Sequence, residues 1–184
     1  MKRRIAISFM VAAILCGSAH AETVDVVSIF AKAAAANETG IARKTKAIDS
    51  RPATPGEVIT TIIKGEGVET KSKPAEPGDF VVRNRCPETG NEEYLVKAAK
   101  FPDRYLDAGQ PAVDGWKEYT PKGKEMKFYM LKANEGPYEF TAPWGEQMIA
   151  KPGDALVQTP GDEKDTYRVA AASFACTYEI VKAP

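Results

Sequence analysis

The sequence predicts a mainly β (α+β) protein, built as a tandem repeat of two small antiparallel sheet or open-barrel units. Residues 77–105 and 152–178 are identical at ten positions when one gap of two residues is placed in a turn. Chance would give roughly one or two such identities, so the repeat indicates two copies of one unit. The segments around these matches are short and β-branched, and turns separate them, which favours antiparallel pairing.

The matched positions keep residue type and spacing in both copies. They are Pro77/Pro152, Gly78/Gly153, Asp79/Asp154, Val82/Val157, Tyr94/Tyr167, Val96/Val169, Ala98/Ala171, Ala99/Ala172, Phe101/Phe174 and Tyr105/Tyr178.

The first 21 residues predict a secretory signal peptide. Three basic residues at 2–4 precede an apolar stretch at 5–15 that is too short to span a bilayer, and Ala19-His20-Ala21 is a small-x-small cleavage site. We therefore expect a periplasmic or secreted protein that does not insert into the membrane after cleavage.

Cleavage changes the inventory of reactive side chains. His20 is the only histidine, and it leaves with the signal together with Cys16. Cys86 and Cys176 remain, and an even pair in an oxidising compartment predicts a disulfide. The signal carries three basic residues and no acidic one, so a whole-chain charge of 0 becomes −3. That charge argues against nucleic acid or an anionic membrane as a partner.

An N-terminal helix is expected within residues 22–40. Apolar side chains recur at helical spacing over 24–36, the alanine run favours helix, and Asn37 to Gly40 supplies a stop. This helix either packs on the protein's own core or docks on a partner.

Repeat unit 1 is predicted at 41–106. Its expected strands lie at 58–63, 68–73, 79–84 and 93–97. Phe101 and Tyr105 follow four residues apart, which suits one helical turn facing the core.

A linker rich in Gly, Pro and Asp is expected at 107–116, before repeat unit 2 at 117–184. The expected strands of this unit lie at 128–133, 138–141, 146–150, 155–159 and 167–170. Pro143-Trp144-Gly145 makes its hairpin longer than that of the first unit.

A Pro-Gly-Asp turn, an apolar strand, a strand with Tyr-x-Val and then Phe-x-x-x-Tyr occur in this order in both copies. This arrangement resembles the bacterial PGDYG-motif family. The resemblance implies small domains without an established activity, and it supplies no catalytic residues. The chain departs from the family at the signature, where Phe80-Val81 and Ala155-Leu156 replace Tyr-Gly.

Several chemistries are missing from the sequence. Without a mature histidine, Ser-His-Asp and Cys-His mechanisms and His-ligated metal sites are excluded. No Gly-x-Ser-x-Gly elbow, P-loop or dinucleotide fingerprint occurs. We therefore expect no catalytic residue, metal site or cofactor.

Asp79 and Asp154 have two possible roles. They occupy equivalent positions, so a pseudo-twofold arrangement could bring them together as a carboxylate pair that catalyses a reaction or binds a ligand. The interpretation that we favour is structural: Pro then Gly suits a type II turn, and the following Asp accepts hydrogen bonds from backbone amides.

Tyr94, Tyr167 and Trp144 are the aromatic candidates for a ligand site, although matched aromatics also build cores. The sequence predicts a non-catalytic binding or protein-interaction module whose partner is a periplasmic protein or a small ligand. Its site would lie in the groove between the copies or over Trp144. The alternatives are a carboxylate-dependent hydrolase of cell-wall glycans, using Asp79 and Asp154 or nearby Glu residues, and a purely structural periplasmic protein.

Overall fold

The computed structural model describes residues 21–184. The predicted signal peptide, with Cys16 and His20, lies outside these residues except for Ala21. The described chain is mainly β with few helices, and its strands form several mostly antiparallel sheets that do not close into a barrel. The predicted fold class is confirmed at this level.

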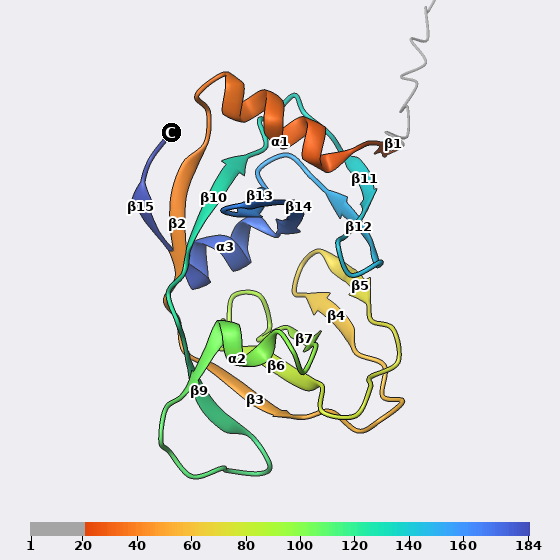
Figure 1. The fold of residues 1–184 in the computed structure, drawn as a ribbon. Helices are drawn as coiled ribbons and strands as arrows, with labels where there is room; N and C mark the ends of the chain where they lie inside the picture. Colours follow the sequence, from red (N-terminus) through yellow and green to blue (C-terminus); the bar gives the residue numbers. More distant parts are fainter. Residues whose placement is uncertain (1–20) are drawn as a thin grey trace, which may run out of the picture.

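Two five-stranded sheets form the body of the protein (Figure 1). The first sheet has the order β7 (Glu93–Val96), β6 (Phe80–Asn84), β3 (Ile48–Pro52), β9 (Lys117–Pro121) and β8 (Tyr105–Asp107). The second sheet has the order β14 (Asp162–Val169), β13 (Ala155–Thr159), β10 (Glu125–Met130), β2 (Gly40–Lys44) and β15 (Tyr178–Lys182). All pairings within both sheets are antiparallel.

Residues 22–106 and residues 117–184 each contribute one strand to the sheet that the other range mainly forms, and these ranges are called the two halves below. β2 precedes β3 in the sequence but pairs with β10 and β15, with Ala42 opposite Met126. In the same way, β9 precedes β10 but pairs with β3 and β8, with Tyr119 opposite Ile48. After this exchange, both sheets run through corresponding elements in the same order. The duplication and the units at 41–106 and 117–184 stay predictions, but each range supplies a strand to the sheet of the other.

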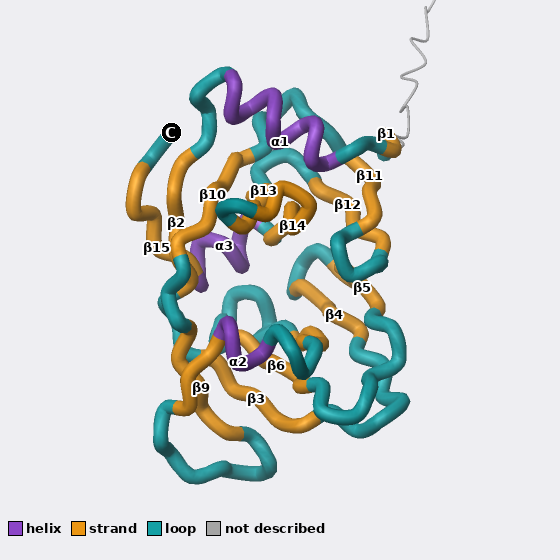
Figure 2. Tube along the Cα trace, viewed as in Figure 1, coloured by secondary structure: helices purple, strands orange, loops and turns teal. Residues whose placement is uncertain are grey.

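Two hairpins extend from this body. β4 (Thr60–Ile63) pairs with β5 (Gly67–Lys71), and β11 (Tyr138–Thr141) pairs with β12 (Gln147–Ala150). The short strand β1 (Glu22–Thr23) adds to β11 in parallel. Residues 108–116, which contain most of the predicted linker, form a loop between β8 and β9 (Figure 2).

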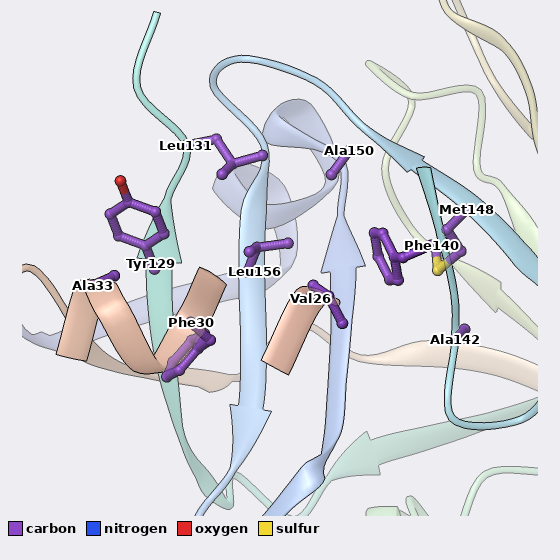
Figure 3. Packing of buried hydrophobic residues seen from close by; sticks show 10 residues of the cluster. All are labelled: Val26, Phe30, Ala33, Tyr129, Leu131, Phe140, Ala142, Met148, Ala150 and Leu156. Carbon is purple, nitrogen blue, oxygen red and sulfur yellow. The ribbon is translucent and has the colours of Figure 1, made fainter. Parts of the chain in front are cut away.

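Helix α1 (Val26–Ala35) covers the second sheet. Asp25 caps it by accepting a hydrogen bond from the Val27 amide at 3.1 Å. The buried residues Val26, Phe30 and Ala33 belong to one cluster with residues of β10, β11, β12 and β13 (Figure 3). The helix therefore packs on the protein's own core, as one of the two sequence interpretations expects.

Two shorter helices, α2 (Phe101–Arg104) and α3 (Ala171–Thr177), follow β7 and β14 at corresponding places. Each buries the matched phenylalanine of the repeat. Phe101 stacks on Phe80 with ring centroids 4.0 Å apart, and Phe174 lies 5.1 Å from Phe128. Because both phenylalanines are 4% exposed, they are core residues rather than ligand contacts.

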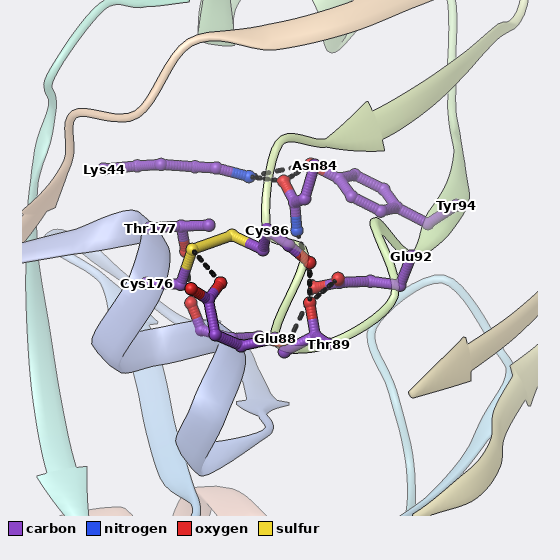
Figure 4. Close-up of a disulfide and its surroundings, with 10 residues drawn as sticks. Lys44, Asn84, Cys86, Glu88, Thr89, Glu92, Tyr94, Cys176 and Thr177 are labelled. Carbon is purple, nitrogen blue, oxygen red and sulfur yellow. Dashed lines mark hydrogen bonds between the residues drawn. A yellow bond between two sulfur atoms is a disulfide. The ribbon is translucent and has the colours of Figure 1, made fainter. Parts of the chain in front are cut away.

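A disulfide joins Cys86 and Cys176, whose Cα atoms lie 6.2 Å apart across 90 residues of sequence. Cys86 follows β6 of the first sheet, and Cys176 lies in α3 beside the second sheet (Figure 4). The predicted bond is therefore confirmed, and it ties the two halves together. Such a bond is compatible with an oxidising compartment.

Candidate functional site

A cavity of about 480 Å³ opens between the two halves of the molecule. Its wall is built by α2, α3, the end of β2, the β4–β5 hairpin, β7, β14 and the β11–β12 turn. Both five-stranded sheets therefore contribute to it. A volume of this size falls within the usual range of small-molecule sites.

Four tyrosines from the matched repeat positions line this cavity. Tyr94 and Tyr105 come from the first sheet, and Tyr167 and Tyr178 come from the second. Burial raises the pKa of Tyr94, Tyr167 and Tyr178 above the usual value. These three phenols therefore stay neutral at pH 7, and each offers a proton for a hydrogen bond.

Lys44 begins a chain of hydrogen bonds across the cavity wall. Its Nζ donates to Tyr94 Oη and to Asn84 Oδ1, both at 2.8 Å (Figure 4). Tyr94 Oη lies 2.9 Å from Tyr105 Oη. Lys44 ends the exchanged strand β2, so the strand exchange brings its ammonium group from the second sheet to the tyrosines of the first.

Glu92 is held on the other side of Asn84. It is 5% exposed and accepts hydrogen bonds from Asn84 Nδ2 at 2.8 Å, from Ser173 Oγ at 2.7 Å and from Thr89 Oγ1. Burial raises its pKa, but these hydrogen bonds outweigh burial and lower it. Both of its oxygens are therefore committed to the protein.

Arg168 lies at the centre of a second group of charged side chains at the cavity wall. It is 4% exposed and donates hydrogen bonds from Nε to Asp154 at 2.7 Å, from Nη1 to Glu69 at 2.7 Å and from Nη2 to Glu66 at 2.8 Å. This guanidinium thus joins β14 to the β4–β5 hairpin of the first half. Glu69 and Arg168 line the cavity.

Three carboxylates bind that guanidinium, and Glu66 also binds Lys151 Nζ at 3.1 Å. Burial and the neighbouring charges of Glu92, Asp154 and Glu66 raise the pKa of Glu69 to about 7, against the opposing effect of Arg168. Glu69 can therefore change its protonation state near neutral pH.

Trp144 lies at the turn of the β11–β12 hairpin and lines the cavity with 38% of its surface exposed. Its ring meets Tyr167 edge to face, with the centroids 5.5 Å apart. The longer hairpin of the second half therefore adds an aromatic surface at the cavity.

Asp79 and Asp154 are each bound within a separate turn. Asp79 accepts from the amides of Glu76 and Ala98 and from Lys97 Nζ at 2.9–3.0 Å. Asp154 accepts from the amides of Lys151 and Ala171 at 2.8 and 3.0 Å, in addition to Arg168. Each aspartate closes its own Pro-Gly-Asp turn, and neither lines the cavity.

The turn geometry agrees with the structural interpretation. Gly78 has φ +90° and Gly153 has φ +87°, which is the left-handed conformation that a type II turn needs at its third residue. The Asp79 amide donates to the Glu76 carbonyl at 3.1 Å, and the Asp154 amide donates to that of Lys151 at 3.0 Å.

The cavity thus brings together three of the five predicted binding residues, Tyr94, Tyr167 and Trp144, and leaves out Asp79 and Asp154. The sequence interpretation missed Lys44, Glu69, Glu92 and Arg104, which also line the cavity. The matched pair Tyr105/Tyr178 could have indicated part of this cavity from the sequence, because both tyrosines line it and Arg104 directly precedes Tyr105.

Within residues 21–184, no three His, Cys, Asp or Glu side chains gather closely enough to hold a metal ion. No helix in that range has the length and apolar character that a membrane crossing requires.

Comparison with known proteins gives no relative from which a role can be transferred: no family model matches the chain, and neither a curated protein nor a solved structure matches it significantly.

Proposed function

We propose that this protein is an exported, non-catalytic binding protein that holds a small ligand in the cavity between its two sheets. The observation that carries the proposal is a preformed cavity of about 480 Å³ lined by four tyrosines, Trp144 and many polar side chains, several of which the protein fixes by hydrogen bonds. A concave site that combines aromatic surface with positioned polar groups is typical of small-molecule binding. The periplasm is the proposed compartment, which the disulfide and the predicted signal peptide support.

The bonding of the carboxylates supports binding rather than catalysis. Both oxygens of Glu92 accept hydrogen bonds from the protein, and Asp79 and Asp154 are occupied in their turns. A catalytic carboxylate needs a free oxygen directed at the substrate. We also keep the relation to the PGDYG-motif family as a proposal, based on the two Pro-Gly-Asp turns.

One observation favours the alternative of a carboxylate-dependent hydrolase. Glu69 faces the cavity with a pKa raised to about 7, so it can hold a proton near neutral pH as a general acid does. If this alternative is correct, Glu69→Gln abolishes release of soluble fragments from purified cell walls. Equal release by the wild type and the variant, or no release by either, rules out this role for Glu69.

The binding proposal is tested by filling the cavity. Thr70 on β5 lines the cavity, whereas Thr60 on the paired strand β4 is exposed and does not line it. Thr70→Trp and Thr60→Trp are therefore matched variants of one hairpin. We expect wild type and Thr60→Trp to bind fragments of a small-molecule library in ligand-detected NMR, and Thr70→Trp to lose the same fragments.

Native mass spectrometry of protein extracted from the periplasm adds a second readout. A co-purifying small molecule should be present on wild type and Thr60→Trp and absent from Thr70→Trp. If no fragment binds, or if Thr70→Trp binds as wild type does, the cavity is not a ligand site and the purely structural role is favoured. Near-UV circular dichroism checks that both variants are folded.

A further inference from the structure

The ammonium group of Lys44 and the hydroxyls of Tyr94 and Tyr105 are linked at the cavity wall. Lys44 donates to Tyr94 Oη, so this hydroxyl uses its acceptor side for the ammonium group. A phenol carries one proton. The nearest acceptor for the Tyr94 proton is Tyr105 Oη at 2.9 Å, since Asn84 Oδ1 is 3.5 Å away and already accepts from Lys44.

The proton between Tyr94 and Tyr105 can come from either hydroxyl, because Tyr94 can also donate to Asn84 Oδ1 at 3.5 Å. When Tyr94 donates to Tyr105, the Tyr105 proton is available to a ligand, since no other acceptor for it lies within residues 21–184. In that arrangement the chain runs from the ammonium group of Lys44 through Tyr94 and ends at Tyr105 as a donor in the cavity wall. Hydrogen-bond chains of this kind polarise along their length, which strengthens the last donor.

Arg104 lies beside the end of this chain. It is half-buried, it lines the cavity, and it forms no ion pair with a carboxylate of residues 21–184. A guanidinium group stays charged near neutral pH, and the neighbours of this one include Tyr105 and Tyr167, from the two sheets.

Lys44 shares this lack of a carboxylate partner. Among residues 21–184, its ammonium group forms hydrogen bonds with Asn84 and Tyr94 and lies 5.3 Å from the centroid of the Tyr94 ring and 6.0 Å from that of Tyr105. Buried charges are usually paired with opposite charges. Lys44 and Arg104 are half-buried near the same tyrosines, and neither has a carboxylate within ion-pair distance among residues 21–184.

Three acidic residues of the cavity have partners other than Arg104 and Lys44. Glu92 is bound by Asn84, Ser173 and Thr89, and Glu69 is bound by Arg168. Asp165 interacts with Arg104 over a distance too long for an ion pair and accepts instead from Thr159 Oγ1 at 2.6 Å. Asp103, Glu146 and Asp162 also border the cavity, but none of them forms an ion pair with Arg104 or Lys44.

We propose that the ligand of this cavity carries an anionic oxygen group, a carboxylate or a phosphate, which Arg104 and Tyr105 bind directly and the charge of Lys44 supports. This inference rests on the proposed function and names the chemistry of its ligand. The aromatic rings of Trp144 and Tyr167, 5.5 Å apart, provide a surface for the uncharged part of the ligand. Charge-assisted hydrogen bonds from a guanidinium group to such an anion are among the stronger polar contacts in proteins.

The test uses probes that share one ring and differ in charge: benzoate, benzamide, benzylammonium and phenyl phosphate. Affinities are measured by isothermal titration calorimetry at pH 7.5 and constant ionic strength. We expect benzoate or phenyl phosphate to bind the wild type at least about tenfold more tightly than benzamide, and benzylammonium to bind most weakly. The two anions distinguish carboxylate from phosphate as the preferred group.

Four variants test whether Arg104 and Lys44 cause the tighter binding of the anionic probes. Arg104→Gln and Lys44→Gln should each remove most of the preference for the anion, whereas Asp165→Asn should increase it by removing a negative charge near Arg104. Lys46→Gln is the matched control, because it changes the net charge equally at an exposed position outside the cavity. This control should bind every probe as the wild type does.

The outcomes separate this inference from the proposed function. If benzamide or benzylammonium binds as tightly as the anions, and Thr70→Trp abolishes that binding, the cavity is a ligand site but the anion inference is wrong. An anion preference that survives in Arg104→Gln and Lys44→Gln also overturns it. If none of the four probes and no library fragment binds, both proposals fail.

Discussion

The ring of Phe128 occupies the space in which a side chain at position 40 would lie. An ideal Cβ on Gly40 would be 2.5 Å from Phe128 Cε1 and 2.5 Å from the carbonyl oxygen of Lys182. Gly40 is paired with Phe128 across β2 and β10. The missing side chain therefore allows the exchanged strand β2 to enter the second sheet between β10 and β15.

Gly40→Ala should lower the free energy of unfolding by about 1–3 kcal/mol, because the added methyl group overlaps both a buried ring and the backbone. Urea unfolding of the variant measures the loss. Gly40→Val should cost more. An unchanged unfolding midpoint in Gly40→Ala would show that β2 is not seated against Phe128.

The strand exchange predicts that the two repeat units do not fold alone. A fragment of residues 117–184 lacks β2 between β10 and β15, and a fragment of residues 22–106 lacks β9 between β3 and β8. Each fragment would expose unpaired strands in the middle of its sheet. We expect each to show poorly dispersed amide signals and no cooperative unfolding, and the mixed fragments to regain both. Cooperative unfolding of either fragment alone would contradict the observed pairing.

Local patterns were sufficient for part of the fold. The β-branched or apolar segments at 79–84 and 155–159 predict β6 and β13 because their side chains favour strands directly. The Pro-Gly-Asp sequence also predicts its turn, since Pro and Gly fix the two central backbone conformations. These features depend on neighbouring residues alone.

The exchanged strands could not be predicted in this way. Residues 40–44 and 117–121 mix charged, polar and apolar residues, and their pairing depends on partners distant in the sequence. The residues of the site were predictable to the same extent. Tyr94 and Tyr167 stand out in the sequence as repeat matches. The hydrogen bond from Lys44 to Tyr94 depends on the pairing of β2 in the second sheet, which the sequence did not indicate.

Removing the disulfide should destabilise the protein and loosen the connection between its halves. The bond closes a segment of 90 residues, so the double variant Cys86→Ser/Cys176→Ser should lose about 2–4 kcal/mol of unfolding free energy. Thermal melts with and without dithiothreitol provide the measurement. The reductant should lower the melting temperature of the wild type and leave that of the double variant unchanged. A wild type insensitive to a reductant that demonstrably frees both thiols would contradict this expectation.

The two turn aspartates should contribute to stability independently. Asp79→Asn should cost about 0.5–2 kcal/mol, because it weakens the hydrogen bonds to two backbone amides and the contact with Lys97. Asp154→Asn should cost at least as much, since it also weakens the buried contact with Arg168. The turns precede strands of different sheets, so the losses should add in the double variant. Stabilised single variants or strong non-additivity would instead indicate a coupled carboxylate pair.

Glu69 should make the protein less stable as the pH rises from about 4.5 to about 7. Its pKa is raised from 4.5 to about 7 by burial and by neighbouring carboxylates. Below pH 4.5 the carboxyl is protonated in both the folded and the unfolded state. Between the two pKa values the unfolded state releases the proton first, so stability falls with pH, by roughly 3 kcal/mol once pH 7 is passed.

Urea unfolding at pH 5, 6, 7 and 8 tests this prediction in the wild type, Glu69→Gln and Glu57→Gln. Glu69→Gln cannot ionise, so its stability should vary much less over this range than that of the wild type. Glu57 is the matched control, because hydrogen bonds from Arg51 and the Thr54 amide lower its pKa to about 2 and it titrates below pH 4.5. Glu57→Gln should therefore lose a similar amount of stability at every pH tested and keep the wild-type slope. If Glu69→Gln keeps that slope as well, Glu69 is ionised throughout, and it cannot serve as a proton donor in the cavity.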